Sequence, residues 1–327
     1  MADKKKGFGP SAKCPQAGYV QSPWQSVPLC PWNHLLNFHQ PKLEHTYLTS
    51  IHRSVCMSDL NTCGLAAGAI LFEMVCGAKT GMSLFHWCRL ILCIAIPGIL
   101  GICCRSGRFP YTSNNPKGRL QVLPFVRALL CGMATLSFVM DYQSHFLNHE
   151  GQSVLDAPPT TTIAPLVFTS LGLRLPFNMH VWVQGLATLV SLPWVVPFHG
   201  DCTVNPILAN SVNEVGYGIE DVLVRISVLG YPLNRPGPLP GDYPCWLVGA
   251  FVHVFVGFVV PTFILYLLEL RSRYRFLKST LQDGCEDAKE LKKFCWCGVA
   301  GFSFLATVGT QMFWFTVKEI GKKSSWC

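Results

Sequence analysis

The chain has 327 residues, of which 50% are hydrophobic and only 13% are Asp, Glu, Lys or Arg, whereas soluble globular domains carry about 25% charged residues. Its formal net charge of +8 is concentrated in a few segments between long apolar stretches. This pattern indicates membrane topology and argues against a nucleic-acid partner. We expect no separate large soluble domain, because six or seven spanning helices with short connections would use most of the length.

Residues 1–59 predict a polar N-terminal tail rich in Pro and Trp. Three lysines stand near its start at residues 4–6, but no apolar core follows them, which argues against a signal peptide. We expect this tail either to lie irregularly at a membrane surface or to be disordered.

Long apolar stretches follow along the rest of the chain. A helix that rises about 1.5 Å per residue needs about 20 apolar residues to cross the hydrocarbon core of a bilayer. Such stretches lie at residues 60–78, 84–104, 120–140, 176–198, 243–268 and 294–317, of which 60–78 is the weakest. The sequence therefore predicts an all-α polytopic bundle that ends in a short tail over residues 318–327.

The Lys and Arg content of the connections predicts their sides of the membrane. Residues 105–119 carry four Lys or Arg and residues 271–293 carry seven, whereas residues 141–159 carry none. The positive-inside rule makes the first two segments cytoplasmic, which requires an even number of crossings between them. We therefore predict a seventh span over residues 160–175, a cytoplasmic N-terminus and a C-terminus on the other face. Six spans, with residues 160–175 re-entrant or interfacial, are the alternative.

Two local sequence patterns predict a turn and an amphipathic helix between the apolar stretches. Arg174, Pro176 and Asn178 favour a tight turn after the short seventh span. Residues 211–230 have apolar side chains at helical spacing, with a capping box at Ser211 and a stop signal at Gly230. This pattern predicts an amphipathic helix on the membrane or across the mouth of the bundle, and its acidic polar face favours packing against protein.

Charged residues inside the apolar stretches need partners, because a charge at the bilayer centre costs about 2.5–3.5 kcal/mol. Glu73 and Arg89 stand at similar distances from the short connection between the first two stretches, so we expect an ion pair between them. The pair would act as a packing lock or as a proton or ion site. Arg127 lies one to two turns inside its stretch, and we expect its side chain to extend to the headgroups.

A cluster of metal-ligating residue types follows the third stretch, at Asp141, His145, His149 and Glu150. The HxxxH spacing is typical of metal-dependent membrane hydroxylases, but those enzymes need further His pairs, which are absent from this sequence. His253 lies deep in its stretch without an evident partner, and we expect it to be a hydrogen-bonded packing residue. The sequence thus predicts no metal and no haem cofactor.

The 16 cysteines form no CxxC pair, which argues against zinc-ribbon and thioredoxin-type sites. Cys202 and Cys245 bracket the connection after residue 198, where an oxidising compartment would let them form a disulfide; two free thiols are the alternative. Cysteines beside basic residues at the membrane surface are candidates for palmitoylation, and these are Cys103, Cys104, Cys295 and Cys297.

Gly64 and Gly68 form a GxxxG face that would permit a homo-oligomer in the membrane. The sequence contains no GxSxG, Walker A, HExxH or glycine-rich dinucleotide motif. These patterns favour a non-enzymatic membrane protein that organises partners or lipids. A small-solute or ion transporter that uses Glu73, Arg89 and proline-interrupted helices is the alternative, and a metal- or haem-dependent membrane oxidoreductase or lipid-modifying enzyme is a further one.

Overall fold

The computed structural model describes residues 36–37, 41–77, 91, 95, 116–145, 158–195, 206–226, 245–280 and 286–324. The described residues contain helices and no strand, which confirms the predicted all-α class. The elements are α1 (Pro41–Gly77), α3 (Pro116–His145), α4 (Pro158–Gly172), α5 (Phe177–Ser191), the 3-10 helix η4 (Leu192–Val195), α7 (Pro206–Arg225), α8 (Cys245–Val254), the π-helix η5 (Phe255–Val259), α9 (Val260–Thr280) and α10 (Glu286–Ser324).

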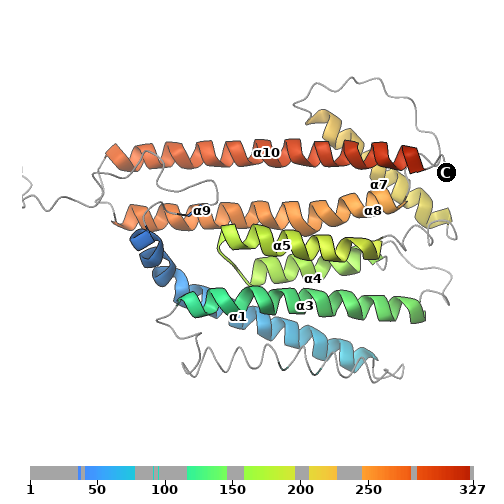
Figure 1. The fold of residues 1–327 in the computed structure, drawn as a ribbon, viewed down its shortest axis with the longest axis horizontal. Coiled ribbons are helices and arrows are strands. Elements are labelled where there is room, and N and C mark those ends of the chain that lie inside the picture. The colour runs from blue at the N-terminus through green and yellow to red at the C-terminus, as the bar shows by residue number, and fades with distance from the viewer. Residues whose placement is uncertain are drawn as a thin grey trace, which may run out of the picture.

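Helices α3, α4, α5, α8–α9 and α10 lie side by side with alternating directions, whereas α1 crosses obliquely and runs in the same direction as α3 (Figure 1). The α4–α5 hairpin sits between α3 on one side and the continuous α8–η5–α9 helix on the other. Helix α10 packs antiparallel to α8–α9, and α7 runs obliquely past the end of the bundle where α8 begins. The start of α3 and the end of α9 therefore lie at the same end of the bundle.

Helix α1 begins earlier than predicted, so the expected irregular tail over residues 1–59 is wrong from Pro41 onward. Proline suits the first position of a helix because its missing N–H is not needed there. No Pro or Gly follows until Gly64. Tyr47, His52 and Asp59 are buried against the bundle, and this tertiary packing holds the polar half of the helix in place.

Helices also extend into two other segments that the sequence predicts as irregular. The basic connection 271–293 is mostly helical, since α9 continues to Thr280 and α10 begins at Glu286. Likewise α10 continues to Ser324, so the predicted tail over residues 318–327 is helical for most of its length. Arg and Lys are good helix formers, and charge alone therefore marks the end of an apolar stretch without marking the end of its helix.

The amphipathic helix α7 covers Pro206–Arg225 instead of residues 211–230. Ser211 lies inside the helix, so the predicted capping box does not start it; Pro206 occupies the first position. Its apolar face is divided, because Val212 and Leu223 are buried whereas Val222 remains exposed. The predicted packing against protein does occur: Glu220 accepts hydrogen bonds from Lys318 of α10 at 2.8 and 2.9 Å.

The predicted tight turn lies at Leu173–Pro176, between two helices of 15 residues each. At about 1.5 Å per residue each is about 22 Å long, shorter than a hydrocarbon core of about 30 Å. Of the described helices, only Cys245–Ser279 is both long and apolar enough to cross a membrane, and Ile163–Gly172 is a shorter apolar helix. The six or seven spans thus stay a prediction.

Candidate functional site

A stripe of polar side chains runs along the buried face of α5. Its members are His180, Gln184, Thr188 and Ser191, and their spacing of four, four and three residues places them on one side of a helix. The opposite face of the same helix carries the exposed apolar residues Trp182 and Leu186. Helix α5 therefore presents its polar side to the interior of the bundle and its apolar side to the surroundings.

Arg127 of α3 donates to this stripe from the centre of the bundle. Its Nη1 lies 2.9 Å from His180 Nδ1, and its Nη2 donates to Gln184 Oε1. All three residues are fully buried. The expected extension of Arg127 to the headgroups is wrong, because α5 supplies acceptors in the interior that are closer than the membrane surface.

The direction of these hydrogen bonds follows from the chemistry of the groups. Arginine only donates, so His180 Nδ1 accepts and the ring proton resides on Nε2. That nitrogen lies 3.2 Å from Thr262 Oγ1 of α9. Three helices are thus joined by Arg127, His180 and Thr262. Of the ion pairs formed by the described residues, none includes Arg127.

Gln184 satisfies a carbonyl group that a proline leaves free. Pro261 has no N–H to donate to the carbonyl of Gly257 four residues earlier. Gln184 Nε2 donates to that carbonyl and also to the Leu166 carbonyl of α4 at 3.3 Å. The π-helix η5 ends at Val259, two residues before Pro261, and the helix continues through the proline without a break. The sequence-based transporter hypothesis expects an interruption here, and the described helix is continuous.

His253 of α8 contacts Ser191, the last residue of the polar stripe. Its Nε2 lies 2.8 Å from Ser191 Oγ, and the Ser191 hydroxyl is 2.9 Å from the carbonyl of Ala187. Both side chains are buried. The expected role of His253 as a hydrogen-bonded packing residue is confirmed.

An ion-pair cluster ties α1 to α9 at the end of the bundle where α9 ends. Arg273 donates to Glu44 at 2.6 and 2.8 Å and to Glu269 at 2.7 and 3.0 Å. Its guanidinium carbon lies 4.3 Å from the centre of the Tyr47 ring, within cation–π range. Burial, assisted by the nearby Glu269 charge, raises the pKa of the Tyr47 hydroxyl above its ordinary value.

A second buried ion pair joins α1 to the start of α3. Arg119 Nε and Nη2 donate to the two carboxylate oxygens of Asp59 at 2.7 and 3.0 Å, and Nη2 also donates to the carbonyl of Arg174 in the α4–α5 turn. Burial raises the pKa of the Asp59 carboxyl above its ordinary value, and Arg119 opposes that rise. This end of the bundle is therefore fixed by two ion-pair groups that share helix α1.

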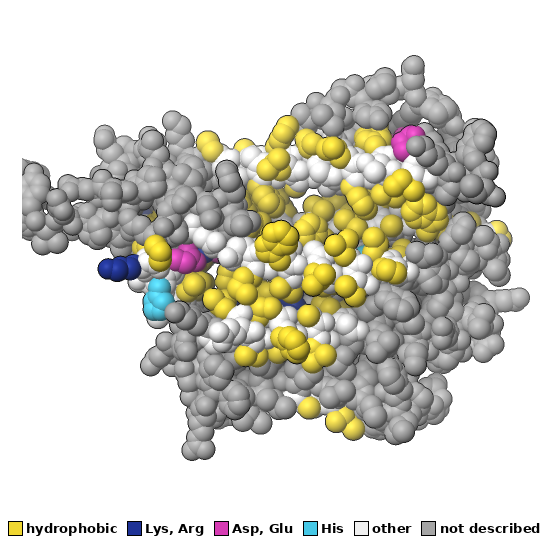
Figure 2. All heavy atoms as spheres, viewed as in Figure 1, with side chains coloured by type: hydrophobic (Ala, Val, Ile, Leu, Met, Phe, Trp, Pro, Cys, Tyr) yellow, Lys and Arg dark blue, Asp and Glu magenta, His cyan; other side chains and the backbone are white. Residues whose placement is uncertain are grey.

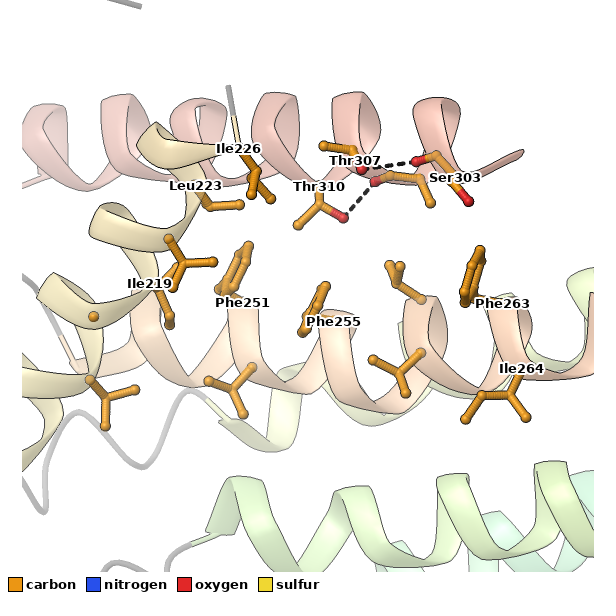
Figure 3. A pocket seen from close by; sticks show the side chains of 17 residues that line it. Ile219, Leu223, Ile226, Phe251, Phe255, Phe263, Ile264, Ser303, Thr307 and Thr310 are labelled. Atoms are coloured by element: carbon orange, nitrogen blue, oxygen red, sulfur yellow. Dashed lines mark hydrogen bonds between the residues drawn. The ribbon is translucent and has the colours of Figure 1, made fainter. Parts of the chain in front are cut away.

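An apolar groove of about 600 Å³ lies between α7, α8–α9 and α10 (Figure 3). Aromatic and branched side chains line it from α7 and α8–α9, and small residues line it from α10. Among the described residues of the lining, the hydroxyl-bearing side chains are Ser303, Thr307 and Thr310. Thr307 and Thr310 donate to carbonyls of their own helix at 2.9 and 2.7 Å, so the lining is almost entirely apolar.

The predicted ion pair and metal cluster fall on side chains outside the described ones. Glu73 lies in helix α1, but its side chain and Arg89 are outside the described part, so the pair stays a prediction. The same holds for the cluster of Asp141, His145, His149 and Glu150, of which only the backbone of the first two, in α3, is described. Within the described ranges, no three His, Cys, Asp or Glu side chains are grouped as metal ligands.

Cys245 is disulfide-bonded at the start of α8. Cys202 lies outside the described residues, and the pairing of these two cysteines stays a prediction. Of the cysteines proposed for palmitoylation, Cys103 and Cys104 also lie outside them. Cys295 and Cys297 are free thiols, of which Cys297 is exposed.

Gly64 and Gly68 lie on an exposed face of α1. A Cβ atom built at either position meets no atom within 4 Å. No described residue therefore covers the GxxxG face, and the homo-oligomer stays a prediction.

Sequence reasoning missed the polar stripe of α5 and both ion-pair groups. The stripe has a signal in the sequence, because His180, Gln184 and Thr188 recur every four residues within an apolar segment. The Asp59–Arg119 pair has no comparable signal, since its partners are 60 residues apart.

Comparison with models of known protein families, with curated proteins and with solved structures finds no match to this chain. What the site can do chemically is therefore inferred from its own geometry. The interior polar groups hydrogen-bond one another and join helices, and the groove offers an apolar surface to a ligand of the same character.

Proposed function

We propose that this chain is a multi-pass integral membrane protein that organises lipids or partner proteins through its helical bundle and performs no catalysis. The observation that carries this proposal is the inverted distribution of polarity. Phe125 and Trp182 are 77% and 75% exposed, whereas Arg127 and Gln184 are fully buried. Soluble proteins place large apolar residues inside and charged residues outside, and a bilayer reverses that preference for the surface.

The surface of the bundle supports the same reading. On the face shown in Figure 2, hydrophobic side chains cover the middle of the helices, and most of the charged side chains of the described residues lie toward the two ends. A belt of this kind suits a hydrocarbon layer about 30 Å thick between two polar interfaces.

Seven crossings account best for the directions of the helices. Six of them would use α1, α3, α4, α5, α8–α9 and α10, and residues 84–104 would supply the other. Arg119 and Arg273 stand at the same end of the bundle, as the positive-inside rule requires for the two basic segments. The short α4 and α5 would cross with local thinning of the bilayer, and a re-entrant hairpin would preserve the same sides.

Two independent features support a cytoplasmic position for the end of α9. Arg271, Arg275 and Lys278 are exposed there, which favours the cytoplasmic face. The opposite end of the same helix carries the disulfide-bonded Cys245, and disulfides persist in oxidising compartments. Lys318, which would otherwise count against this orientation, pairs with Glu220 of α7.

The interior favours an organising role over chemistry. His180, Gln184 and Ser191 each donate or accept within the bundle, and their contacts join α5 to α3, α4, α8 and α9. Networks that are satisfied in this way rigidify a structure and specify its packing. A rigid bundle with an apolar surface and a lateral groove is suited to holding lipids or other membrane proteins in place.

Two experiments test the membrane assignment. Alkaline carbonate extraction of membranes from cells that express the chain should leave it in the pellet. Thiol labelling of sealed vesicles should find Gly107→Cys and Gly284→Cys accessible from the cytoplasmic face and Gly151→Cys from the other. Release of the chain by carbonate would overturn the proposal, and labelling of Gly107→Cys and Gly284→Cys from opposite faces would overturn its topology.

A transporter is the second candidate, and one observation favours it. The Arg127 guanidinium is buried with no acidic partner among the described residues, and its Nε–H has no hydrogen-bond acceptor in the described structure. A buried cation of this kind could bind an anionic solute. Flux into liposomes that is lost in Arg127→Gln or Glu73→Gln, and retained in Arg225→Gln at the surface, would replace the organising role.

A further inference from the structure

We propose that an acyl chain of a bilayer phospholipid occupies the apolar groove between α7, α8–α9 and α10. This inference rests on the proposed membrane function and names a ligand for it. The groove is bounded by three separate elements, and its occupant would connect them.

Helix α10 is held to α8–α9 by aromatic contacts at two places. Toward its C-terminus, Trp314 packs edge-on against Phe251 with ring centres 4.7 Å apart. Toward its N-terminus, Phe302 stacks on Tyr266 with ring centres 4.2 Å apart. The groove lies between these two contacts, and Figure 2 shows an opening there between α10 and α8–α9.

The side chains across the opening are mismatched in size. Helix α10 contributes Ser303, Ala306 and Thr307, whereas α9 and η5 contribute Phe255 and Phe263 (Figure 3). Protein interiors are close-packed, and small residues on one helix normally allow the other helix to approach closely. A groove of about 600 Å³ nevertheless remains beside this stretch, which points to an occupant.

The chemistry of the lining favours an apolar occupant over water. Bound water needs two to four polar partners, and of the three hydroxyls among the described lining residues those of Thr307 and Thr310 already donate to backbone carbonyls. The volume of about 600 Å³ lies within the range of ligand pockets. A flexible hydrocarbon chain matches this apolar lining.

The depth of the groove selects an acyl chain over a lipid headgroup. Phe255 lies 10 residues after Cys245, near the centre of the apolar part of the α8–α9 helix, and Ile264 lies 19 residues after Cys245, still within that apolar part. The mouth is lined by Val222, Ile226 and Ile264, which are all exposed. An acyl chain could therefore pass from the bilayer into the groove without crossing a polar surface.

The test uses the full chain reconstituted with phosphatidylcholine that carries a diazirine in the middle of one acyl chain. The protein is first extracted into lipid-free mild detergent, which removes loosely bound lipid, and is then irradiated. We expect adducts on Phe255, Phe263 and residues 303–310 on the groove side, and few on Leu305, which is 67% exposed. Adducts that are equally frequent on Leu305 and Ala306 would overturn the proposal, and this arm needs no variant.

Filling the groove supplies a second arm. Ala306→Trp should reduce the phosphatidylcholine retained after extraction by at least about fivefold, measured by native mass spectrometry. The matched control Leu305→Trp, on the neighbouring outward position of the same helix, should change it by less than about twofold. If Ala306→Trp fails to fold, Ser303→Phe fills the same groove from one turn earlier. Unchanged retention in a folded groove variant would overturn the proposal.

Other occupants give distinct results. Organic extraction that yields free fatty acid and no phospholipid, or a dimer that is lost in Ala306→Trp while no lipid is retained, would assign the groove to another ligand and overturn this inference. A chain that stays in carbonate-washed membranes but retains no lipid overturns the inference alone. A chain released by carbonate overturns the proposed function as well.

Discussion

Arg127 and His180 meet in the interior of the bundle with 2.9 Å between Nη1 and Nδ1, and neither residue is exposed. The guanidinium is thus held by a histidine ring and the Gln184 carboxamide in place of a carboxylate. Among the described residues, its positive charge is compensated only by the hydrogen bonds that it donates to α5. The stability of α3 against α5 should therefore depend strongly on the acceptors.

Replacement of Gln184 by Leu should destabilise the bundle by about 3 kcal/mol, because it leaves a buried charge with fewer acceptors and the Gly257 carbonyl without its donor. Adding Arg127→Leu should recover part of that loss, since the uncompensated charge is removed. Unfolding in detergent micelles with rising SDS measures both variants. A double variant that is less stable than Gln184→Leu alone would contradict this account of the network.

The buried Asp59–Arg119 pair should be worth far more than the exposed Asp221–Arg225 pair. Asp59→Asn removes the charge that faces a buried guanidinium and should cost about 3 kcal/mol. Arg225 is 77% exposed and pairs within one helix turn, so Asp221→Asn should change the stability by less than about 0.5 kcal/mol. The same SDS unfolding assay compares the two variants. Equal losses of stability would refute the claim that burial determines how much each ion pair contributes.

Gly172 allows α4 to approach α1 closely. A Cβ atom there would lie 2.7 Å from Thr62 Oγ1 and 3.0 Å from Thr62 Cβ, and rotation of the threonine cannot move its Cβ away. Gly172→Ala should destabilise the bundle by about 1–3 kcal/mol. The control Gly132→Ala, where a Cβ meets nothing within 4 Å, should be neutral or slightly stabilising because Ala favours helix. A neutral Gly172→Ala would mean that the helices shift apart at no cost.

The sequence predicts much of the helix content because hydrophobic runs and turn residues are local signals. The turn between α4 and α5 lies where Arg174 and Pro176 favour it. The helix ends are less predictable, because α1 is extended to Pro41 by tertiary burial of Tyr47 and Asp59. Local patterns do not contain that information.

The polar stripe of α5 has a periodic signal in the sequence, but the partners of its residues on other helices could not be predicted, for a related reason. Arg127 is compatible with either a headgroup or an interior acceptor, and the choice depends on which face of α5 turns toward α3. That rotation is set by the packing of all the helices together. The hydrogen-bonded role of His253 could be predicted from the sequence, but its partner could not, because Ser191 is 62 residues away.

The disulfide of Cys245 gives a redox prediction. Non-reducing peptide mass spectrometry should identify Cys202 as the partner, and reduction should lower the stability by about 3–4 kcal/mol for a closed loop of about 43 residues in the chain-entropy model. Thermal unfolding with and without reductant measures this change. Fully alkylatable Cys202 in the native protein would exclude the pairing, and the bond of Cys245 would then join it to another cysteine.

The π-helix η5 determines the rotation of α9 about its own axis. A π turn contains one residue more than an α turn, and one residue corresponds to about 100° of rotation. Because of this insertion, α8 turns His253 toward Ser191 while α9 turns Thr262 toward His180 and Arg273 toward Glu44. If the unchanged sequence wound as regular α-helix through Phe255–Val259, α9 would rotate by about 100° away from its partners on α1 and α5. Deletion of a single residue from this segment would instead restore an α turn and leave α9 facing them, so the extra residue of the π turn is what gives α8 and α9 their different neighbours.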